Sequence, residues 1–156
     1  VPALRQMRGV ESMMLGDDTG DQLLLMRWSR DVAESPLLRG VPDLPPVPTE
    51  RSLYFTRDFR LQQWGSESRW TLWRADLSGP IAEWRADLPG YDPRQRPWAA
   101  QALARLREHE DADGGAAPLV WTDVYPLFTT KTPGVSVAGA ARAPDGSITI
   151  VAYDLL

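Results

Sequence analysis

Residues that could bind a small molecule lie close together between Tyr91 and Trp98. The segment reads Tyr-Asp-Pro-Arg-Gln-Arg-Pro-Trp and runs into an alanine-rich stretch that begins at Ala99. A guanidinium group offers a planar set of N–H donors that suits a carboxylate, and aromatic faces pack on cations or apolar ligand bodies. The sequence places no catalytic base or nucleophile beside these residues. The segment therefore favours binding of a ligand over reaction with it.

The same segment predicts the helix that would position these side chains. A residue before proline prefers extended geometry and proline is favoured at the first helical position, so Arg96 is the expected N-cap and Pro97 the first helical residue. The apolar residues of the helix then share one face: Trp98, Ala102 and Leu106. The positive end of the helix would help Arg96 to bind an anion. An ion pair of Arg96 with Asp92 or Asp87 is the alternative role.

The composition argues against several other kinds of site. The chain has 156 residues, of which 17 are basic and 21 acidic, and its formal net charge of −4 gives no electrostatic case for nucleic acid. The lack of cysteine excludes a disulfide scaffold, and a single histidine, His109, argues against a catalytic triad or a multi-histidine metal site. No nucleophile elbow, spaced carboxylate pair or phosphate-binding glycine loop is present. We therefore expect no enzymatic activity, cofactor or metal in this segment.

The first third of the chain is predicted to be helical. Residues 2–15 and a second segment from Asp21 to Ser35 carry apolar residues at helical spacing. The proline-rich residues that follow cannot form a helix or a central strand, and they are interpreted as an extended linker. At this length we expect a single domain. Its expected parts are a helical segment at 1–40, the linker at 41–50 and a strand-rich module at 51–156.

Short β-type runs dominate the remainder of the chain. The expected strands are Ser52–Thr56, Phe59–Trp64, Arg69–Arg74, Leu119–Tyr125, Val135–Arg142 and Ser147–Leu155, with Arg57-Asp58 separating the first two. The Pro-Asp-Gly turn that ends at Gly146 predicts a hairpin between the last two strands. Asp154 shares a face of the last strand with Ile148 and Ile150. If that face meets the core, Asp154 is a carboxylate at the edge of the core that requires a partner.

The ligand-binding segment, the strands after it and the closing hairpin, in their order along the chain, resemble Cache domains. These are the extracytoplasmic PAS-like sensor modules of chemoreceptors, sensor kinases and nucleotide cyclases. The resemblance covers about residues 50–156 and rests on Tyr91–Trp98, on Trp121–Tyr125 and on the closing hairpin with Val151–Leu155. It implies an α+β fold: a PAS-like antiparallel sheet of five or six strands flanked by helices, with N-terminal helices leading in. It also implies a small-molecule pocket against the sheet. The module is most similar to the membrane-distal half of a double Cache receptor, with a single Cache module as the alternative.

The resemblance also implies a set of ligand-binding residues. In amino-acid-binding members the motif has a tyrosine, an arginine five residues later, a tryptophan two residues further and then a second tyrosine. Tyr91, Arg96 and Trp98 match this pattern, whereas Ala99 stands where the second tyrosine is expected. Extended spacing would place Arg94 beside Arg96, and Asp123 beside Tyr125, although a structural salt bridge is the alternative for Arg94. The expected ligand-binding residues are Tyr91, Arg94, Arg96, Trp98, Asp123, Tyr125 and Asp154.

The expected function is sensing of a small metabolite that bears a carboxylate or an amine. We expect the module on the extracytoplasmic face of a bacterial membrane, in signal transduction such as chemotaxis, with membrane spans flanking it and an output domain elsewhere in the intact protein. A homodimer is one expected arrangement. One alternative is a dimerisation or spacer module that binds no ligand, which Ala99 favours. Another is a carbohydrate-binding module, which predicts a planar row of exposed tryptophans among the seven in the chain.

Overall fold

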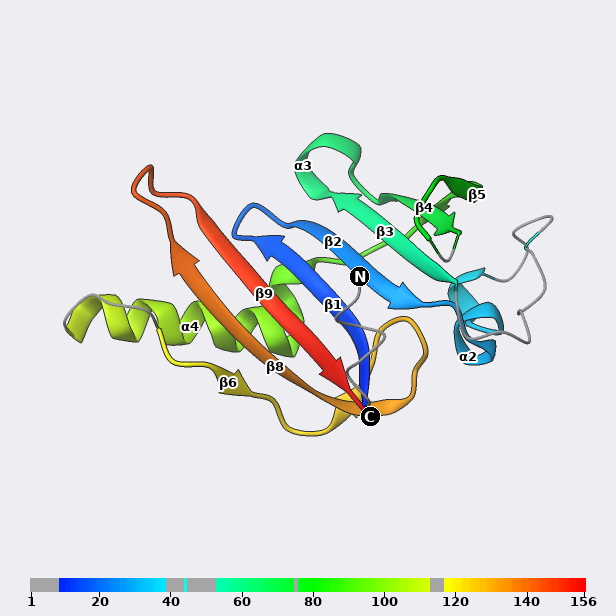
Figure 1. Ribbon diagram of the computed structural model, residues 1–156. Coiled ribbons are helices and arrows are strands. Elements are labelled where there is room, and N and C mark those ends of the chain that lie inside the picture. The colour runs from blue at the N-terminus through cyan, green and yellow to red at the C-terminus, as the bar shows by residue number, and fades with distance from the viewer. Residues whose placement is uncertain (1–8, 39–43, 45–52, 75, 113–116) are drawn as a thin grey trace.

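The computed structural model describes residues 9–38, 44, 53–74, 76–112 and 117–156. Its strands form an open antiparallel sheet with a few helices, which is an α+β arrangement (Figure 1). The strands are β1 (Val10–Asp17), β2 (Asp21–Arg27), β3 (Tyr54–Arg60), β4 (Glu67–Trp73), β5 (Pro80–Asp87), β6 (Val120–Trp121), β7 (Tyr125–Pro126), β8 (Pro133–Arg142) and β9 (Ile148–Leu155). The helices are α2 (Arg30–Ala33), α3 (Leu61–Trp64) and α4 (Pro97–Ala112), and 3-10 turns η1 and η2 span Pro36–Leu38 and Pro93–Gln95.

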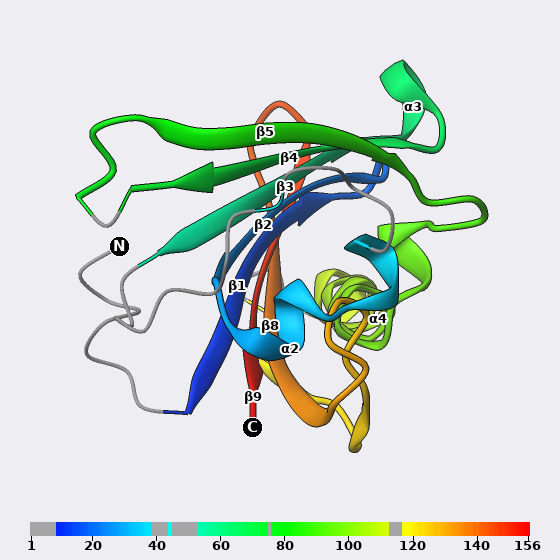
Figure 2. The same cartoon turned by 90° about the vertical axis from the view of Figure 1, so that its right-hand side faces the viewer.

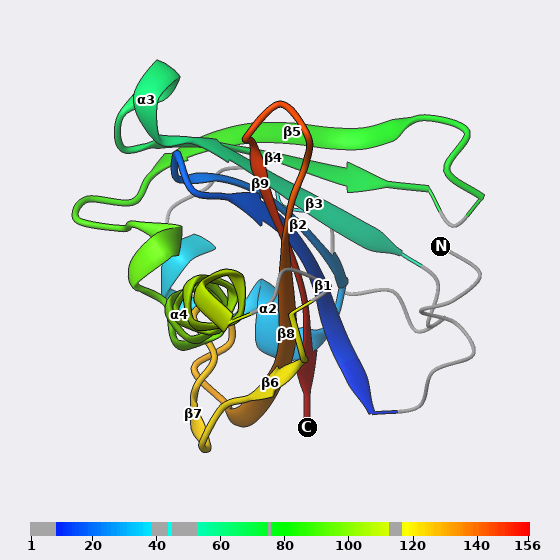
Figure 3. The same cartoon turned by 90° about the vertical axis from the view of Figure 1, so that its left-hand side faces the viewer.

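The order of strands across the sheet is β5-β4-β3-β2-β1-β9-β8-β6, and β7 also pairs with β8. The first and last thirds of the chain therefore meet at the centre, where β1 pairs with β9. Helices α2 and α4 lie on the same side of the twisted sheet (Figures 2 and 3). This side of the sheet forms the main core, and the candidate site lies within it.

The core forms because side chains alternate between the two faces of each strand. On the helix side, Phe55, Trp70 and Trp84 stack across β3, β4 and β5, with ring centroids 5.5 Å and 5.9 Å apart. The apolar face of α4 completes this core with Trp98, Ala102 and Leu106, which share one face as predicted and are buried. Helix α4 begins at Pro97 after an extended Arg96, which also confirms the predicted start.

The expected helices at the N-terminus are wrong within the described residues. Residues 10–17 and 21–27 form β1 and β2, and α2 is the only helical part of the second segment. The side chain of Asp17 holds the intervening hairpin turn by accepting hydrogen bonds from the backbone of Thr19, Gly20 and Asp21. The run of apolar residues in β2 fits a buried helix as well as a strand, which explains the error. Residues 2–8, 41–43 and 45–50, and with them most of the expected linker, lie outside the described residues.

The expected sheet of five or six strands is also too small, since the described residues alone form a sheet of nine. β3 continues through Arg57-Asp58, where a break between two strands was expected, and the chain then forms α3 in place of a second strand. The strand expected at Leu119–Tyr125 consists of the two short strands β6 and β7. The strands β4, β8 and β9 are confirmed. The hairpin turn before β9 is confirmed too, with Gly146 at φ +88°.

Candidate functional site

Buried polar side chains gather where β1, β2, β3 and β9 face the start of α4 and the loop after β7. They surround a hollow of about 20 Å³, which is room for about one water molecule. Five of the seven residues expected to bind a ligand line this hollow, although they come from separate parts of the chain: Tyr91, Arg96, Trp98, Tyr125 and Asp154. The fold therefore brings most of the motif to one place.

Asp154 forms the negative side of the hollow. The isoleucine face of β9 lies in the core, so this carboxylate is only 7 % exposed and has the partners that such burial requires. Ser12 and Ser136 donate to its two oxygens at 2.7 Å and 2.5 Å, and the Tyr125 hydroxyl lies 3.5 Å from Oδ1. Burial raises the pKa of Asp154, and these hydroxyl donors partly offset that effect by stabilising the charged form.

Tyr125 connects this carboxylate to the positive side of the hollow. Its hydroxyl lies 2.6 Å from the Ser136 hydroxyl, and the Arg96 guanidinium stands 5.6 Å from the centroid of its ring. Burial, together with the nearby charge of Asp154, raises the pKa of Tyr125 to about 12. The phenol is therefore neutral at physiological pH and serves as a hydrogen-bonding group.

Arg96 lies at the edge of the hollow and is partly exposed. Its Nη2 donates to the Pro126 carbonyl at 3.4 Å, which is a weak contact. Neither of the ion pairs considered as alternatives is formed. Asp92 binds Arg94, and Asp87 accepts a hydrogen bond from Ser66. Arg96 thus remains available to an anion at the mouth of the hollow.

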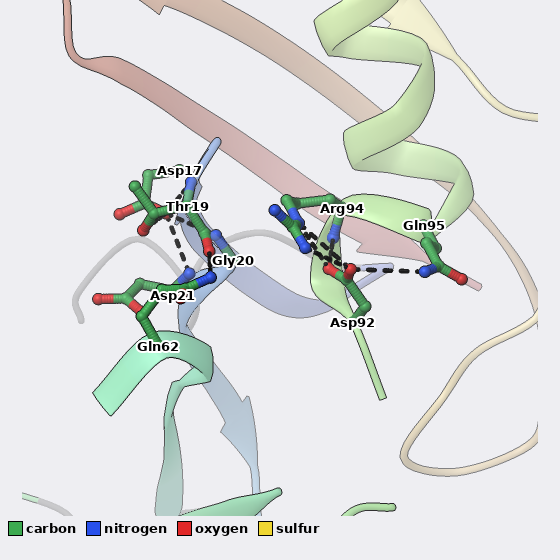
Figure 4. Close-up of polar contacts among 8 residues, drawn as sticks. All are labelled: Asp17, Thr19, Gly20, Asp21, Gln62, Asp92, Arg94 and Gln95. Carbon is green, nitrogen blue, oxygen red and sulfur yellow. Dashed lines mark hydrogen bonds and ion pairs between the residues drawn. The ribbon is translucent and has the colours of Figure 1, made fainter. Parts of the chain in front are cut away.

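Arg94 and Asp123 do not join this site. The residues Pro93–Gln95 form a 3-10 turn, so Arg94 points toward the β1–β2 turn near Gly20 and not alongside Arg96 (Figure 4). Its guanidinium binds Asp92 at 2.8 Å, which matches the structural salt bridge considered as the alternative. Asp123 lies in the exposed bend between β6 and β7, outside any strand, so it does not share a face with Tyr125.

The most deeply buried charge at the site is Arg57, which was expected to lie in a break between two strands. Arg57 lies in the middle of β3 and is 1 % exposed. Its Nη2 donates to Gln22 Oε1 at 2.8 Å and to the Tyr91 hydroxyl at 2.9 Å, and the same hydroxyl donates to Gln22. The alternation of Phe55, Arg57 and Phe59 on one face of a single strand is the sequence signal that would have predicted this position.

Three cations lie around the ring of Phe128, which is in the loop after β7. The distances from its centroid are 5.2 Å to Arg57 Cζ, 5.4 Å to Arg96 Cζ and 4.4 Å to Lys131 Nζ. Burial and the charges of Arg96 and Arg57 lower the pKa of Lys131. None of the three cations forms an ion pair with another described residue. The loop therefore contributes to a local excess of positive charge.

Two larger depressions lie nearby. A cleft of about 460 Å³ shares Tyr91, Arg96 and Phe128 with the hollow, so these side chains separate it from the buried site. A groove of about 660 Å³ near β3, β4 and β5 is lined by tryptophans, among them Trp64 and Trp73. Trp64 is covered by the Arg69 guanidinium at 3.8 Å, and Trp73 donates to Thr56. The planar row of exposed tryptophans that a carbohydrate-binding module predicts is not formed by the described residues.

Neither a metal site nor a membrane-crossing helix is found within the described parts of the chain. No group of three or more histidine, aspartate or glutamate side chains there is placed to hold an ion. None of the described helices combines the length and apolar character that a membrane crossing requires. A comparison with models of known protein families gives no match, and a comparison with curated proteins gives none either.

Proposed function

We propose that this chain is a ligand-sensing module that binds a small metabolite between the sheet and the start of α4. The observation that carries the proposal is the convergence of Tyr91, Arg96, Trp98, Tyr125 and Asp154 around one hollow. These residues come from three separate stretches of the chain and combine aromatic walls with groups of both charges. Ligand sites typically have such apolar and aromatic walls with a few placed polar groups.

The resemblance to Cache domains supports the finer parts of the proposal. The first of these parts is a PAS-like architecture of the sheet. The second is an extracytoplasmic position in a membrane-bound receptor, whose intact chain carries flanking membrane spans and an output domain. The module itself carries out no reaction. Binding would signal by favouring one of two arrangements of the pocket, and it requires different affinities for the two.

A metabolite needs more space than the hollow provides in this arrangement. Small-molecule sites usually measure about 300–1,000 Å³, whereas the hollow measures about 20 Å³. The adjoining cleft of about 460 Å³ reaches the required size and shares Phe128 with the hollow. We infer that the loop carrying Phe128 moves when a ligand enters, which joins the two spaces and links binding to a change of shape.

A thermal-shift screen of amino acids, organic acids, amines and purines tests the proposal. A compound that raises the melting temperature of the wild type should have a smaller effect on Arg96→Ala. Arg94→Ala is the matched control, because Arg94 lies two residues away and its charge is directed to Asp92. If a compound shifts all three proteins equally, the role proposed for Arg96 is wrong.

The second candidate function is a spacer or dimerisation module that binds no metabolite. Two observations favour it: the hollow is almost filled by the protein's own side chains, and Ala99 is buried where a second ring was expected. This candidate predicts that no compound in the screen changes the melting temperature of the wild type. A reproducible shift with any of the compounds, weakened by Arg96→Ala, would exclude it.

A further inference from the structure

Arg57 is a buried cation that has no counter-ion among the residues that the structure describes. Its side chain is 1 % exposed, and its hydrogen-bond partners, Gln22 and Tyr91, are both neutral. Two of its nitrogens, Nε and Nη1, have no hydrogen-bond partner among the described residues. Burial of a charge is costly unless it is paired, so an anion that reaches the free nitrogens of Arg57 would offset this cost.

The surroundings of Arg57 favour a bound group that is flat and negatively charged. The guanidinium lies 5.5 Å from the ring centroid of Trp70, 4.9 Å from that of Tyr91 and 5.2 Å from that of Phe128. These rings hold the guanidinium in place and leave its free N–H donors for a ligand. A carboxylate can accept two parallel hydrogen bonds from one guanidinium, which makes it a suitable partner.

The charges around the hollow do not balance. Arg57, Arg96 and Lys131 gather at Phe128, and Asp154 is the one carboxylate among the residues that line the hollow. Among the lining residues the excess is one positive charge, from Arg57 and Arg96 against Asp154, and Lys131 adds a second beside Phe128. Both carboxylate oxygens of Asp154 already accept a hydrogen bond from a serine hydroxyl, so Asp154 does not depend on an ammonium group from a ligand. The site therefore carries an excess of positive charge that an anionic ligand would neutralise.

We propose that this site binds a small organic dianion, such as a dicarboxylate, and that Arg57 holds one of its carboxylates. The second carboxylate is bound by Arg96 and Lys131 at the mouth of the hollow. The ligand reaches Arg57 from the cleft of about 460 Å³ when Phe128 moves aside, since Phe128 and Tyr91 line both spaces. This inference rests on the proposed sensing function and names the class of ligand.

Calorimetric titration with succinate tests the inference. We expect Arg57→Met to weaken succinate binding by at least about 10-fold, which corresponds to the loss of hydrogen bonds to a charged group. The melting temperature of Arg57→Met without ligand should stay the same or rise, because the change removes an unpaired buried charge. Arg60→Met is the matched control: Arg60 lies on the same strand but pairs with Asp21 and Asp58, and this change should leave succinate binding unaltered.

Lys131→Met keeps the test decisive if Arg57→Met does not fold, because Lys131 is exposed and its replacement is tolerated by the core. We expect it to weaken succinate binding by about threefold, which is within the range for a solvent-exposed ion pair. Equal affinity in the wild type and in the folded variants would overturn the inference. Binding of amines or neutral amino acids without binding of succinate would overturn it too, while leaving the sensing function intact. If no compound of any class binds, the sensing function fails as well.

Discussion

The charge of Asp154 gives the sharpest prediction for stability, and Ser136→Ala is the change that tests it. Ser136 is fully buried and donates to Asp154 Oδ1 at 2.5 Å. A hydrogen bond to a charged group contributes about 1.5–3 kcal/mol. Because Ser12 still donates to the other oxygen, we expect a loss near the middle of this range, about 2 kcal/mol at neutral pH.

The loss should depend on pH, because the Ser136 hydroxyl stabilises the charged form of Asp154. Burial already raises the pKa of Asp154 in the folded protein, and removal of this donor raises it further. A group with a raised folded pKa contributes stability below its unfolded pKa, and that contribution is lost as the pH rises through the folded pKa. As the pH rises from the unfolded to the folded pKa of Asp154, the variant therefore loses more stability than the wild type does. The difference between them should therefore shrink as the pH falls toward the ordinary range of aspartate.

Urea unfolding from about pH 7.5 down to about pH 4.5 measures this effect, with Ser68→Ala as the control. Ser68 is also fully buried in the sheet, but it donates to the neutral carbonyl of Ala86 at 2.6 Å. Its replacement should cost an amount of stability that does not change with pH. If the loss in Ser136→Ala is equally independent of pH, Asp154 does not carry a charge that this hydroxyl stabilises, and the reasoning is wrong.

Two further predictions concern the same region. Alkaline titration followed by tyrosine absorbance should show one phenol with a pKa of about 12. Tyr125→Phe should remove that step. A titration profile that the substitution leaves unchanged would contradict the burial of Tyr125 beside Asp154. Gly134→Ala should destabilise the protein by about 1–3 kcal/mol in urea unfolding, because its Cβ would stand 2.8 Å from the Leu155 carbonyl oxygen. Gly79→Ala, where a Cβ meets nothing within 4 Å, is the control, and equal effects of the two changes would refute the packing proposed at Gly134.

The sequence predicted the part of the site that depends on local rules. Proline at the first helical position set the start of α4, and the period of two along β9 placed Asp154 beside the core once the isoleucine face was known to be inside. Arg94 does not lie where local spacing predicted it. Its expected position beside Arg96 required an extended chain, whereas Pro93–Gln95 forms a 3-10 turn.

The remaining parts required information that local patterns do not contain. The apolar run in β2 satisfies the spacing of a helix and of a strand alike, and only pairing with β1 and β3 selects the strand. Arg57-Asp58 was expected to separate two strands, whereas β3 runs through both residues. The burial of Arg57 depends on Gln22 and Tyr91, which are far from it in the sequence and adjacent to it in the fold.

The most direct test of the sensing function is a crystal structure of the protein with the ligand that binds best in the screen. We expect electron density for the ligand between the sheet and the start of α4, within hydrogen-bonding distance of Arg57 or Arg96, and a displaced Phe128. Density confined to the groove beside Trp64 and Trp73, with the hollow around Asp154 unchanged, would contradict it.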